Sequence, residues 1–173
     1  MSILSILDNI ASNTKRSYKL DVLSQHKDNP LLRRVIKMAL DPYLNFYIKK
    51  IPKYPPGSGS LSLDEALTKL EYLSNRIVTG NAAIEHLAQI LSSVSEDDAV
   101  VIARIIGKDL RCGIADATVN AVIENFIPTY PCLLARPYTQ KNIANILFPA
   151  YSQLKADGVR TNAMVKNGMV TLC

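Results

Sequence analysis

Through residues 1–128, apolar side chains recur every three to four positions, and capping residues separate one repeat from the next. This spacing places the apolar residues on one face of a helix. Asn29-Pro30 is typical of a helix start, because asparagine caps free amides and proline suits the first turn. Ser62 followed by Glu65 is a capping-box pattern. The sequence therefore predicts a mainly α chain.

Each expected helix has its own apolar stripe to bury. The stripes are Ile3, Ile6, Leu7 and Ile10; Leu20 and Leu23; Leu31, Leu32, Val35, Ile36 and Ala39; Ala66, Leu67, Leu70 and Leu73; Ile84, Leu87, Ala88 and Leu91; and Val100, Val101, Ile105 and Ile106. We expect the last of these helices to end at Arg111-Cys112-Gly113 and another to start near Ala115-Asp116. Residues 54–60 are expected to form a surface connection.

The pattern changes at the Ile-Pro-Thr-Tyr-Pro run of residues 127–131, after which helical stripes weaken. Residues 148–154 and 159–166 are typical of strands, and Asn167-Gly168 is typical of a two-residue hairpin turn. Residues 169–173 would begin the returning strand. We therefore expect a helical domain over 1–128 and the first strands of a sheet within 129–173.

The net charge of +5 is unevenly distributed along the chain. Residues 1–60 carry a net +6, residues 61–128 a net −5 and residues 129–173 a net +4. Basic first and last segments suit a polyanion that lies across both, although a solvated basic surface would give the same charge. Arg33, Arg34 and Lys37 are one candidate phosphate-contacting face, with a solvated helix face as the alternative.

Other features of the sequence limit the classes of protein and site that we expect. Three cysteines and two histidines, all widely spaced, fit neither a disulfide framework nor a zinc site and indicate a reducing compartment. The first residues lack the basic start of a signal peptide, and no stretch is long and apolar enough for a membrane span. We therefore expect no membrane association and no metal bound by cysteine or histidine.

Near the C-terminus, Lys155 lies between an apolar run and a glycine, with Asp157 two residues on and Arg160 five residues on. A free lysine has a pKa of about 10.4, so a nucleophilic lysine needs burial or a neighbouring cation such as Arg160 to lower it. Gly158 allows a tight turn. A nucleotide phosphate could lie between Lys155 and Arg160, although a solvated hairpin corner fits the same residues.

A second candidate site lies at residues 108–116. Gly113 is a plausible left-handed cap, and the amides that open the following helix could hold an anion. Arg111 and Lys108 could contact a DNA phosphate, and the small side chains of Gly113 and Ala115 would let the backbone approach a minor groove. An ordinary helix corner is the alternative, which Asp116 favours because an acid repels phosphate.

The residues from Lys155 to Arg160 resemble the first motif of the covalent nucleotidyltransferases, which are ATP-dependent DNA ligases, RNA ligases and capping enzymes. Three flanking stretches narrow the resemblance: residues 148–154, 79–85 and 108–113. With them, nearly the whole chain resembles the ATP-dependent DNA ligases of T-even-type phages. The resemblance implies an all-helical DNA-binding domain, 1–128, and the opening of an α+β adenylation (nucleotidyltransferase) domain, 129–173.

The resemblance also implies ATP as cofactor and a divalent metal, normally Mg²⁺, with no metal ligand within these residues. Lys155 would attack the α-phosphate of ATP and keep AMP, which passes to the 5′-phosphate of a nick before the 3′-hydroxyl displaces it. Gln153 and the Leu154 backbone would contact adenine, Arg160 would contact ribose or phosphate, and Asp157 would lie near the reacting phosphate. Gly158 belongs to the same ATP-binding motif.

For DNA, the resemblance implies contacts from Arg111, Gly113 and Ala115, with Thr118 and Gly80 as weaker candidates. Many relatives have a lysine shortly after the Thr-Gly pair, where this chain has Asn81 and Ala82. The implied partner is nicked double-stranded DNA, and we expect a monomer in the cytoplasm, that of the host cell if the source is viral.

We expect these residues to be the N-terminal part of a longer ligase and to be inactive alone, because the family's acidic metal-binding motifs, adenine-stacking aromatic and later lysines are not among them. One alternative is a non-catalytic DNA-binding module. Another is an RNA ligase or capping-type enzyme, which would share the lysine motif but not the helical domain.

Overall fold

The computed structural model describes residues 2–48, 50–129, 138–151 and 163–172. The chain divides into two compact units, Met1–Thr129 and Tyr130–Cys173. This division falls next to the boundary expected after residue 128. The identity of the two units as a DNA-binding domain and the start of an adenylation domain stays a prediction.

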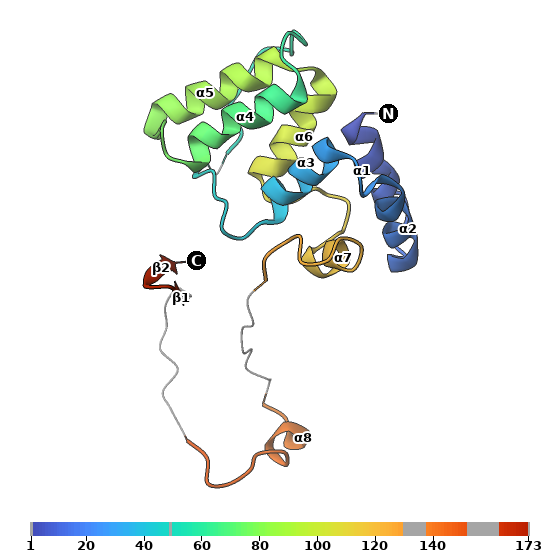
Figure 1. Cartoon of the computed structure of the whole chain (residues 1–173), viewed down its shortest axis with the longest axis vertical. Helices are drawn as coiled ribbons and strands as arrows, with labels where there is room; N and C mark the ends of the chain where they lie inside the picture. Colours follow the sequence, from blue (N-terminus) through green and yellow to red (C-terminus); the bar gives the residue numbers. More distant parts are fainter. Residues whose placement is uncertain (1, 49, 130–137, 152–162, 173) are drawn as a thin grey trace. The chain divides into compact units, whose positions relative to one another are not determined.

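The first unit is built from helices joined by turns and loops (Figure 1). Its helices are α1 (Ile3–Ala11), α2 (Arg16–His26), α3 (Pro30–Leu40), α4 (Leu63–Ser74), α5 (Gly80–Ser93), α6 (Glu96–Ile106) and α7 (Asp116–Asn120). The prediction of a mainly α chain is confirmed. Among the described residues, no helix is long and apolar enough to cross a membrane.

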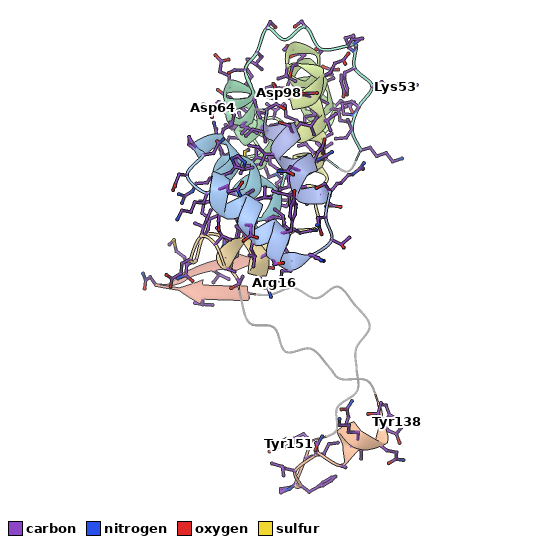
Figure 2. All side chains as sticks on the ribbon, turned by 90° about the vertical axis from the view of Figure 1, so that its right-hand side faces the viewer. Arg16, Lys53, Asp64, Asp98, Tyr138 and Tyr151 are labelled. Atoms are coloured by element: carbon purple, nitrogen blue, oxygen red, sulfur yellow. The ribbon has the colours of Figure 1, made fainter. Side chains whose placement is uncertain are left out.

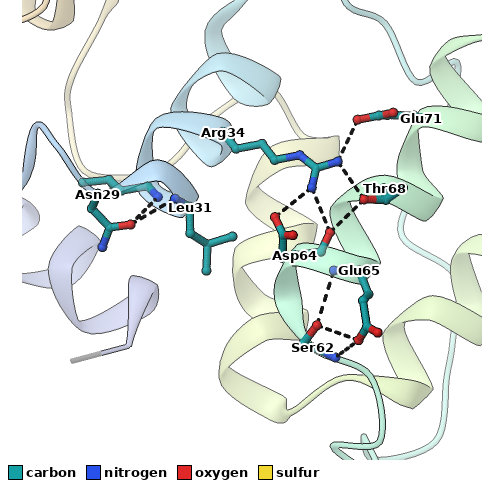
Figure 3. Close-up of polar contacts among 9 residues, drawn as sticks. Asn29, Leu31, Arg34, Ser62, Asp64, Glu65, Thr68 and Glu71 are labelled. Carbon is teal, nitrogen blue, oxygen red and sulfur yellow. Dashed lines mark hydrogen bonds and ion pairs between the residues drawn. The ribbon is translucent and has the colours of Figure 1, made fainter.

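The helix starts follow the capping pattern of the sequence (Figure 3). The Asn29 side-chain oxygen accepts hydrogen bonds from the amides of Leu31 and Leu32 at 3.0 and 3.1 Å. Ser62 and Glu65 form the reciprocal capping box at the start of α4. Both starts satisfy amides that a helix otherwise leaves without partners, which explains why α3 and α4 begin where they do.

The core of the first unit is centred on α6, which contacts α1, α3 and α5. Val101, Ile102 and Ile105 are fully buried on its inner face. Leu7 and Ile10 from α1 are also fully buried. Burial of a branched aliphatic side chain contributes about 1.5–3 kcal/mol, so this shared apolar interior is what holds the helices in a fixed arrangement.

Three details of α5 and α6 differ from the sequence prediction. Ile84 and Val100 were expected to be inside, but their side chains are 45% and 41% exposed. Three-to-four spacing gives a helix an apolar face that is wider than the area its neighbouring helices cover. Residues at the border of that face, such as Ile84 and Val100, therefore remain exposed to water. The helix α6 also ends earlier than expected, at Ile106, with Gly107 as its C-cap.

The connection before α4 lies against the end of α5 and is held there by backbone hydrogen bonds. The amides of Ser58, Gly59 and Leu61 donate to the carbonyls of Ser92, Val94 and Ser93, at 2.9, 3.2 and 2.9 Å respectively. These bonds satisfy carbonyls at the C-terminal end of α5 that have no partner within the helix. The surface connection is therefore a structural part of the first unit.

The described part of the second unit contains the short helix α8 (Gln140–Ile143) and the hairpin of β1 (Ala163–Lys166) and β2 (Met169–Leu172). The strands are antiparallel, with Lys166 opposite Met169. Asn167 and Gly168 both have positive φ, 51° and 78°. Two left-handed residues are what a tight hairpin turn needs, so the predicted turn is confirmed.

The strand expected over residues 148–154 is wrong for its described part. Residues 148–151 form no strand, and the side chains of Phe148 and Tyr151 are 80% and 99% exposed. Apolar residues alone do not make a strand unless a neighbouring strand supplies hydrogen bonds. Residues 152–154 and 159–162 lie outside the described residues, and of the strand expected over 159–166, the part from Ala163 onward is β1.

Candidate nucleic-acid interface

The turn between α6 and α7, residues 107–115, presents an exposed arginine, and we call it the Arg111 turn. Arg111 has a φ of 54°, and its backbone N–H donates to Asp109 Oδ1 at 2.8 Å. This aspartate-closed loop holds Arg111 in a left-handed conformation that non-glycine residues rarely adopt. Within the described part of the chain, no hydrogen bond or ion pair engages the Arg111 guanidinium. Its charge is therefore available to a phosphate.

Gly113 suits the geometry of the same turn. Its φ is +63°, and a Cβ placed on it would overlap Lys19 Nζ. The Lys19 ammonium lies there because it donates to the carbonyl oxygens of Cys112 and Gly113, at 2.7 and 3.0 Å. Lys19 comes from α2, more than ninety residues away in sequence, so no local pattern could have revealed this contact. It places a second cation beside the Arg111 turn.

Arg104 fastens the start of the turn to the first helix. Its guanidinium forms an ion pair with Asp8 at 2.9 Å and donates to the carbonyl of Leu110 at 3.3 Å. Cys112 is buried beneath the turn, and burial raises the pKa of its thiol. A protonated, buried thiol is a poor nucleophile. The turn is thus fixed to α1 and α2 while Arg111 remains outside.

Lys108 was expected to contact phosphate, and the structure assigns it a different role. Its ammonium donates to the carbonyl oxygens of Met38, Asp41 and Leu44, at 3.1, 2.8 and 2.9 Å. These bonds use all three ammonium donors at the C-terminal end of α3, where a positive charge is favourable. Burial lowers the pKa of Lys108, and the nearby Asp41 carboxylate partly opposes that effect. Lys108 therefore joins α3 to the turn.

Ala115 and Thr118 lie at the start of α7, where an anion site was expected. Ala115 is exposed and precedes the helix without a side-chain cap. However, α7 has only five residues, and the amides of Thr118 and Val119 both donate to the Ala115 carbonyl, at 2.9 and 3.1 Å. Asp116, exposed in the first turn, adds a negative charge. This helix start offers little to an anion, and DNA contacts of Ala115 and Thr118 stay predictions.

Gly80 begins α5 and faces open space. Its φ is +61°, and a Cβ placed on it would have nothing within 4 Å. Thr79, the residue before it, makes no side-chain hydrogen bond to cap the helix. A partner could therefore approach the backbone at this point closely, which agrees with the expected DNA contact without testing it.

Two of the three basic residues on α3 are engaged within the protein. The Arg34 guanidinium pairs with Asp64 and Glu71 at 2.8 and 2.7 Å and donates to Thr68 (Figure 3). The Arg33 guanidinium lies over the Phe126 ring, 5.0 Å from its centroid. Arg34 thus joins α3 to α4, and Lys37 is the exposed cation of this set. Because its guanidinium is paired within the protein, Arg34 does not belong to a free phosphate-contacting face.

The candidate nucleotide site cannot be described in the same way. Gln153, Leu154, Lys155, Asp157, Gly158 and Arg160 all lie outside the described residues. In the described part of the second unit, Tyr138 and Tyr151 are almost fully exposed, at 86% and 99% (Figure 2). Elsewhere in the described ranges, no three histidine, cysteine, aspartate or glutamate side chains gather to hold a metal ion.

The sequence matches proteins named DNA ligase. It is 42% identical over 171 residues to the DNA ligase of Enterobacteria phage T4, and equally to that of Enterobacteria phage T6. The chain is therefore similar in sequence to part of the T4 and T6 phage DNA ligases. The match covers 95% of the chain but 35% of each ligase, so the chain spans about a third of the length of these relatives. No family model matches it.

Two solved structures share the fold of most of this chain. Pmar-Lig_PreS3 matches with a TM-score of 0.68 and 25% identity, covering 74% of this chain and 32% of that one. Pmar-Lig_Pre. matches with a TM-score of 0.72 over 83% of this chain and 35% of that one, at 24% identity. The helical arrangement described above therefore recurs in other proteins.

Proposed function

We propose that this chain is the DNA-binding and lysine-bearing part of an ATP-dependent DNA ligase that seals nicks in duplex DNA. The observation that carries the proposal is the 42% identity over 171 residues to two phage DNA ligases. That match covers nearly the whole chain, so it includes residues on both sides of the boundary near residue 129.

In this proposal, Lys155 supplies the nucleophile. Its neutral amine attacks the α-phosphorus of ATP, a phosphorus–nitrogen bond forms, and pyrophosphate leaves. The AMP is then transferred from Lys155 to the 5′-phosphate of the nick, which restores the amine. Finally, the 3′-hydroxyl attacks that phosphate, AMP leaves, and the phosphodiester bond is complete. Covalent catalysis of this kind divides one difficult step into easier ones.

Other residues near Lys155 would hold the nucleotide. Gln153 and the Leu154 backbone would contact adenine, and Arg160 would contact ribose or phosphate with its planar guanidinium. Asp157 lies two residues from the nucleophile, and Gly158 allows the turn that follows. When bound, a divalent metal such as Mg²⁺ would offset triphosphate charge.

The helical unit would hold the DNA. Arg111 presents a cation that has no partner among the described residues, Lys19 lies beside it with its ammonium on two carbonyl oxygens of the turn, and Gly113 gives the backbone its left-handed turn. None of these groups forms an array of side chains suited to reading base edges, so binding should depend little on sequence. We propose nicked double-stranded DNA as the partner of a monomeric ligase that acts in the cytoplasm, that of the host cell if the source is viral.

The proposal is tested by labelling the protein encoded by the complete reading frame with α-labelled ATP and Mg²⁺. We expect acid-labile label on Lys155 and none in Lys155→Ala. Label on another residue, or label taken from GTP in preference to ATP, would favour a capping-type enzyme. In either case the assignment as a DNA ligase would be wrong.

A further inference from the structure

A cavity of about 520 Å³ lies between two parts of the chain. One is the segment after α3 that contains Phe46 to Lys50, and the other is the turn between α4 and α5. We call this cavity the Tyr47 pocket, and its lining residues used below are Phe46, Tyr47, Lys50, Leu73, Arg76 and Ile84. Phe46 and Leu73 are buried, with 2% and 1% of their surfaces exposed, and give the cavity an apolar interior. A cavity of this size fits one or two bulky side chains.

The mouth of the Tyr47 pocket carries apolar side chains that the fold leaves in water. Tyr47 is 61% exposed and Ile84 is 45% exposed. Exposed apolar groups gathered around a cavity are typical of a surface that another molecule covers. They also explain why Ile84, on the apolar stripe of α5, does not enter the core.

The charge of the pocket indicates what kind of molecule that is. Lys50 and Arg76 line it, and no aspartate or glutamate does so among the described residues. The Arg76 guanidinium lies 4.9 Å from the centroid of the Tyr47 ring and, within the described chain, forms no ion pair. Its positive charge is therefore held at the mouth by stacking while its N–H groups stay available.

The backbone holds this arrangement in place. Tyr47 and Arg76 both have positive φ, 58° and 56°, although neither is glycine. The backbone N–H of Tyr47 donates to Asn45 Oδ1 at 3.0 Å, and that of Arg76 donates to the Leu73 carbonyl at 3.0 Å. Left-handed conformations of bulky residues cost free energy, and their presence in a stacked pair adds to the case for a recognition surface.

From these features, we propose that the Tyr47 pocket binds a short acidic segment of a partner protein through one bulky apolar side chain. The apolar side chain enters between Phe46 and Leu73, and neighbouring carboxylates meet Arg76 and Lys50. Duplex DNA fits less well, because its outer surface is charged and convex, and the exposed Ile84 would lie against phosphates. Gly80, a candidate DNA contact, lines the same pocket, so this proposal assigns that corner of the helical unit to a protein segment in place of DNA.

The test uses the 173-residue chain and a synthetic peptide, acetyl-Asp-Glu-Phe-Leu-Glu-Asp-amide, followed by amide chemical shifts in NMR. Two matched peptides separate the contributions: in one, serines replace Phe-Leu, and in the other, amides replace the carboxylates. We expect saturable shifts at residues of the Tyr47 pocket with the first peptide. Arg76→Ala and Ile84→Glu should each weaken binding about tenfold.

Val100→Glu is the control for Ile84→Glu, because Val100 is also an exposed apolar residue in a helix but does not line the pocket. It should leave peptide binding unchanged. Circular dichroism checks that each variant is folded, and Ile84→Ala replaces Ile84→Glu if that variant is not. No saturable shift, equal binding of all three peptides, or equal weakening by Val100→Glu would overturn the proposal. Displacement of the peptide by a thymidine oligonucleotide would also overturn it, in favour of a nucleic-acid pocket.

Discussion

Two cations three residues apart in the Arg111 turn have opposite roles, and only their contacts distinguish them. Arg111 is exposed and its guanidinium has no partner in the described part of the chain, whereas Lys108 donates to three carbonyls. An unpaired surface charge contributes little to folding but can bind phosphate. A half-buried ammonium that satisfies several acceptors contributes to folding, because its removal would leave them unsatisfied.

The first prediction at this scale concerns Arg111. Arg111→Ala should weaken binding to all duplex sequences alike and should reduce the slope of log affinity against log salt by about one, because one phosphate contact and its counterion release are lost. Lys69→Ala, which removes an exposed cation on α4, serves as control. Fluorescence anisotropy with nicked and intact duplex at several salt concentrations measures both. An unchanged slope in Arg111→Ala would remove the turn from the interface.

Lys108→Met should give the reverse result. Methionine keeps a similar apolar stem but leaves the carbonyls of Met38, Asp41 and Leu44 without the ammonium, so the free energy of unfolding should fall by about 2–3 kcal/mol. At a temperature where the variant is still folded, its salt slope should equal that of the unchanged chain. Urea unfolding and the same anisotropy titration measure the two quantities. A normal stability with a flatter slope would restore Lys108 as a phosphate contact.

Among the helices, features set by neighbours in sequence could be predicted, and features set by distant partners could not. The starts of α3 and α4 follow from Asn29 and Ser62, whose side chains cap amides two or three residues away. The hairpin turn at Asn167-Gly168 is equally local. In contrast, the carbonyl groups that accept hydrogen bonds from Lys108 belong to residues more than sixty positions away, and no sequence pattern identifies them.

The wrong predictions have a related physical cause. Periodicity finds the apolar face of a helix but not how much of it the neighbouring helices cover, so Ile84 and Val100 were placed inside. Arg34 was placed on a candidate phosphate-contacting face, with a solvated face as the alternative, because no local pattern identifies its partners on α4, which are thirty or more residues away. The sequence could therefore point to the Arg111 turn as a candidate site by its residue types. Only the three-dimensional contacts show which basic side chains are engaged within the protein and which are free to bind a partner.

The contact between the loop before α4 and the end of α5 gives a prediction about these elements. A Cβ at Gly57 would collide with the Val94 backbone carbonyl, whereas one at Gly59 would meet nothing within 4 Å. Gly57→Ala should therefore displace the loop and lower the free energy of unfolding by about 1–3 kcal/mol. Gly59→Ala is the matched control and should cost only the strain of its left-handed φ, about 1 kcal/mol. Thermal unfolding compares them, and equal stabilities would show that the loop moves freely.

For the whole chain, the distribution of charge and the distribution of the core lead to different expectations about its two units. The buried apolar residues of the described chain all lie between Ile3 and Ile127. The first unit therefore has a core of its own and should fold alone. However, its charges nearly cancel, because residues 1–60 carry +6 and residues 61–128 carry −5, while residues 129–173 add +4.

The last prediction follows from that contrast. Residues 1–129 should fold cooperatively and bind duplex DNA weakly, through local contacts such as Arg111 in place of a general positive field. The 173-residue chain should bind more tightly at low salt and with a steeper salt slope, because the added cations can reach more phosphates. The advantage of the longer chain should shrink as salt rises and screens the charges. Parallel anisotropy titrations of both chains against nicked duplex measure this difference.

Identical salt slopes would show that the basic residues beyond 129 make no contact with DNA. A first unit that fails to unfold cooperatively would show that the core before residue 129 is insufficient for folding.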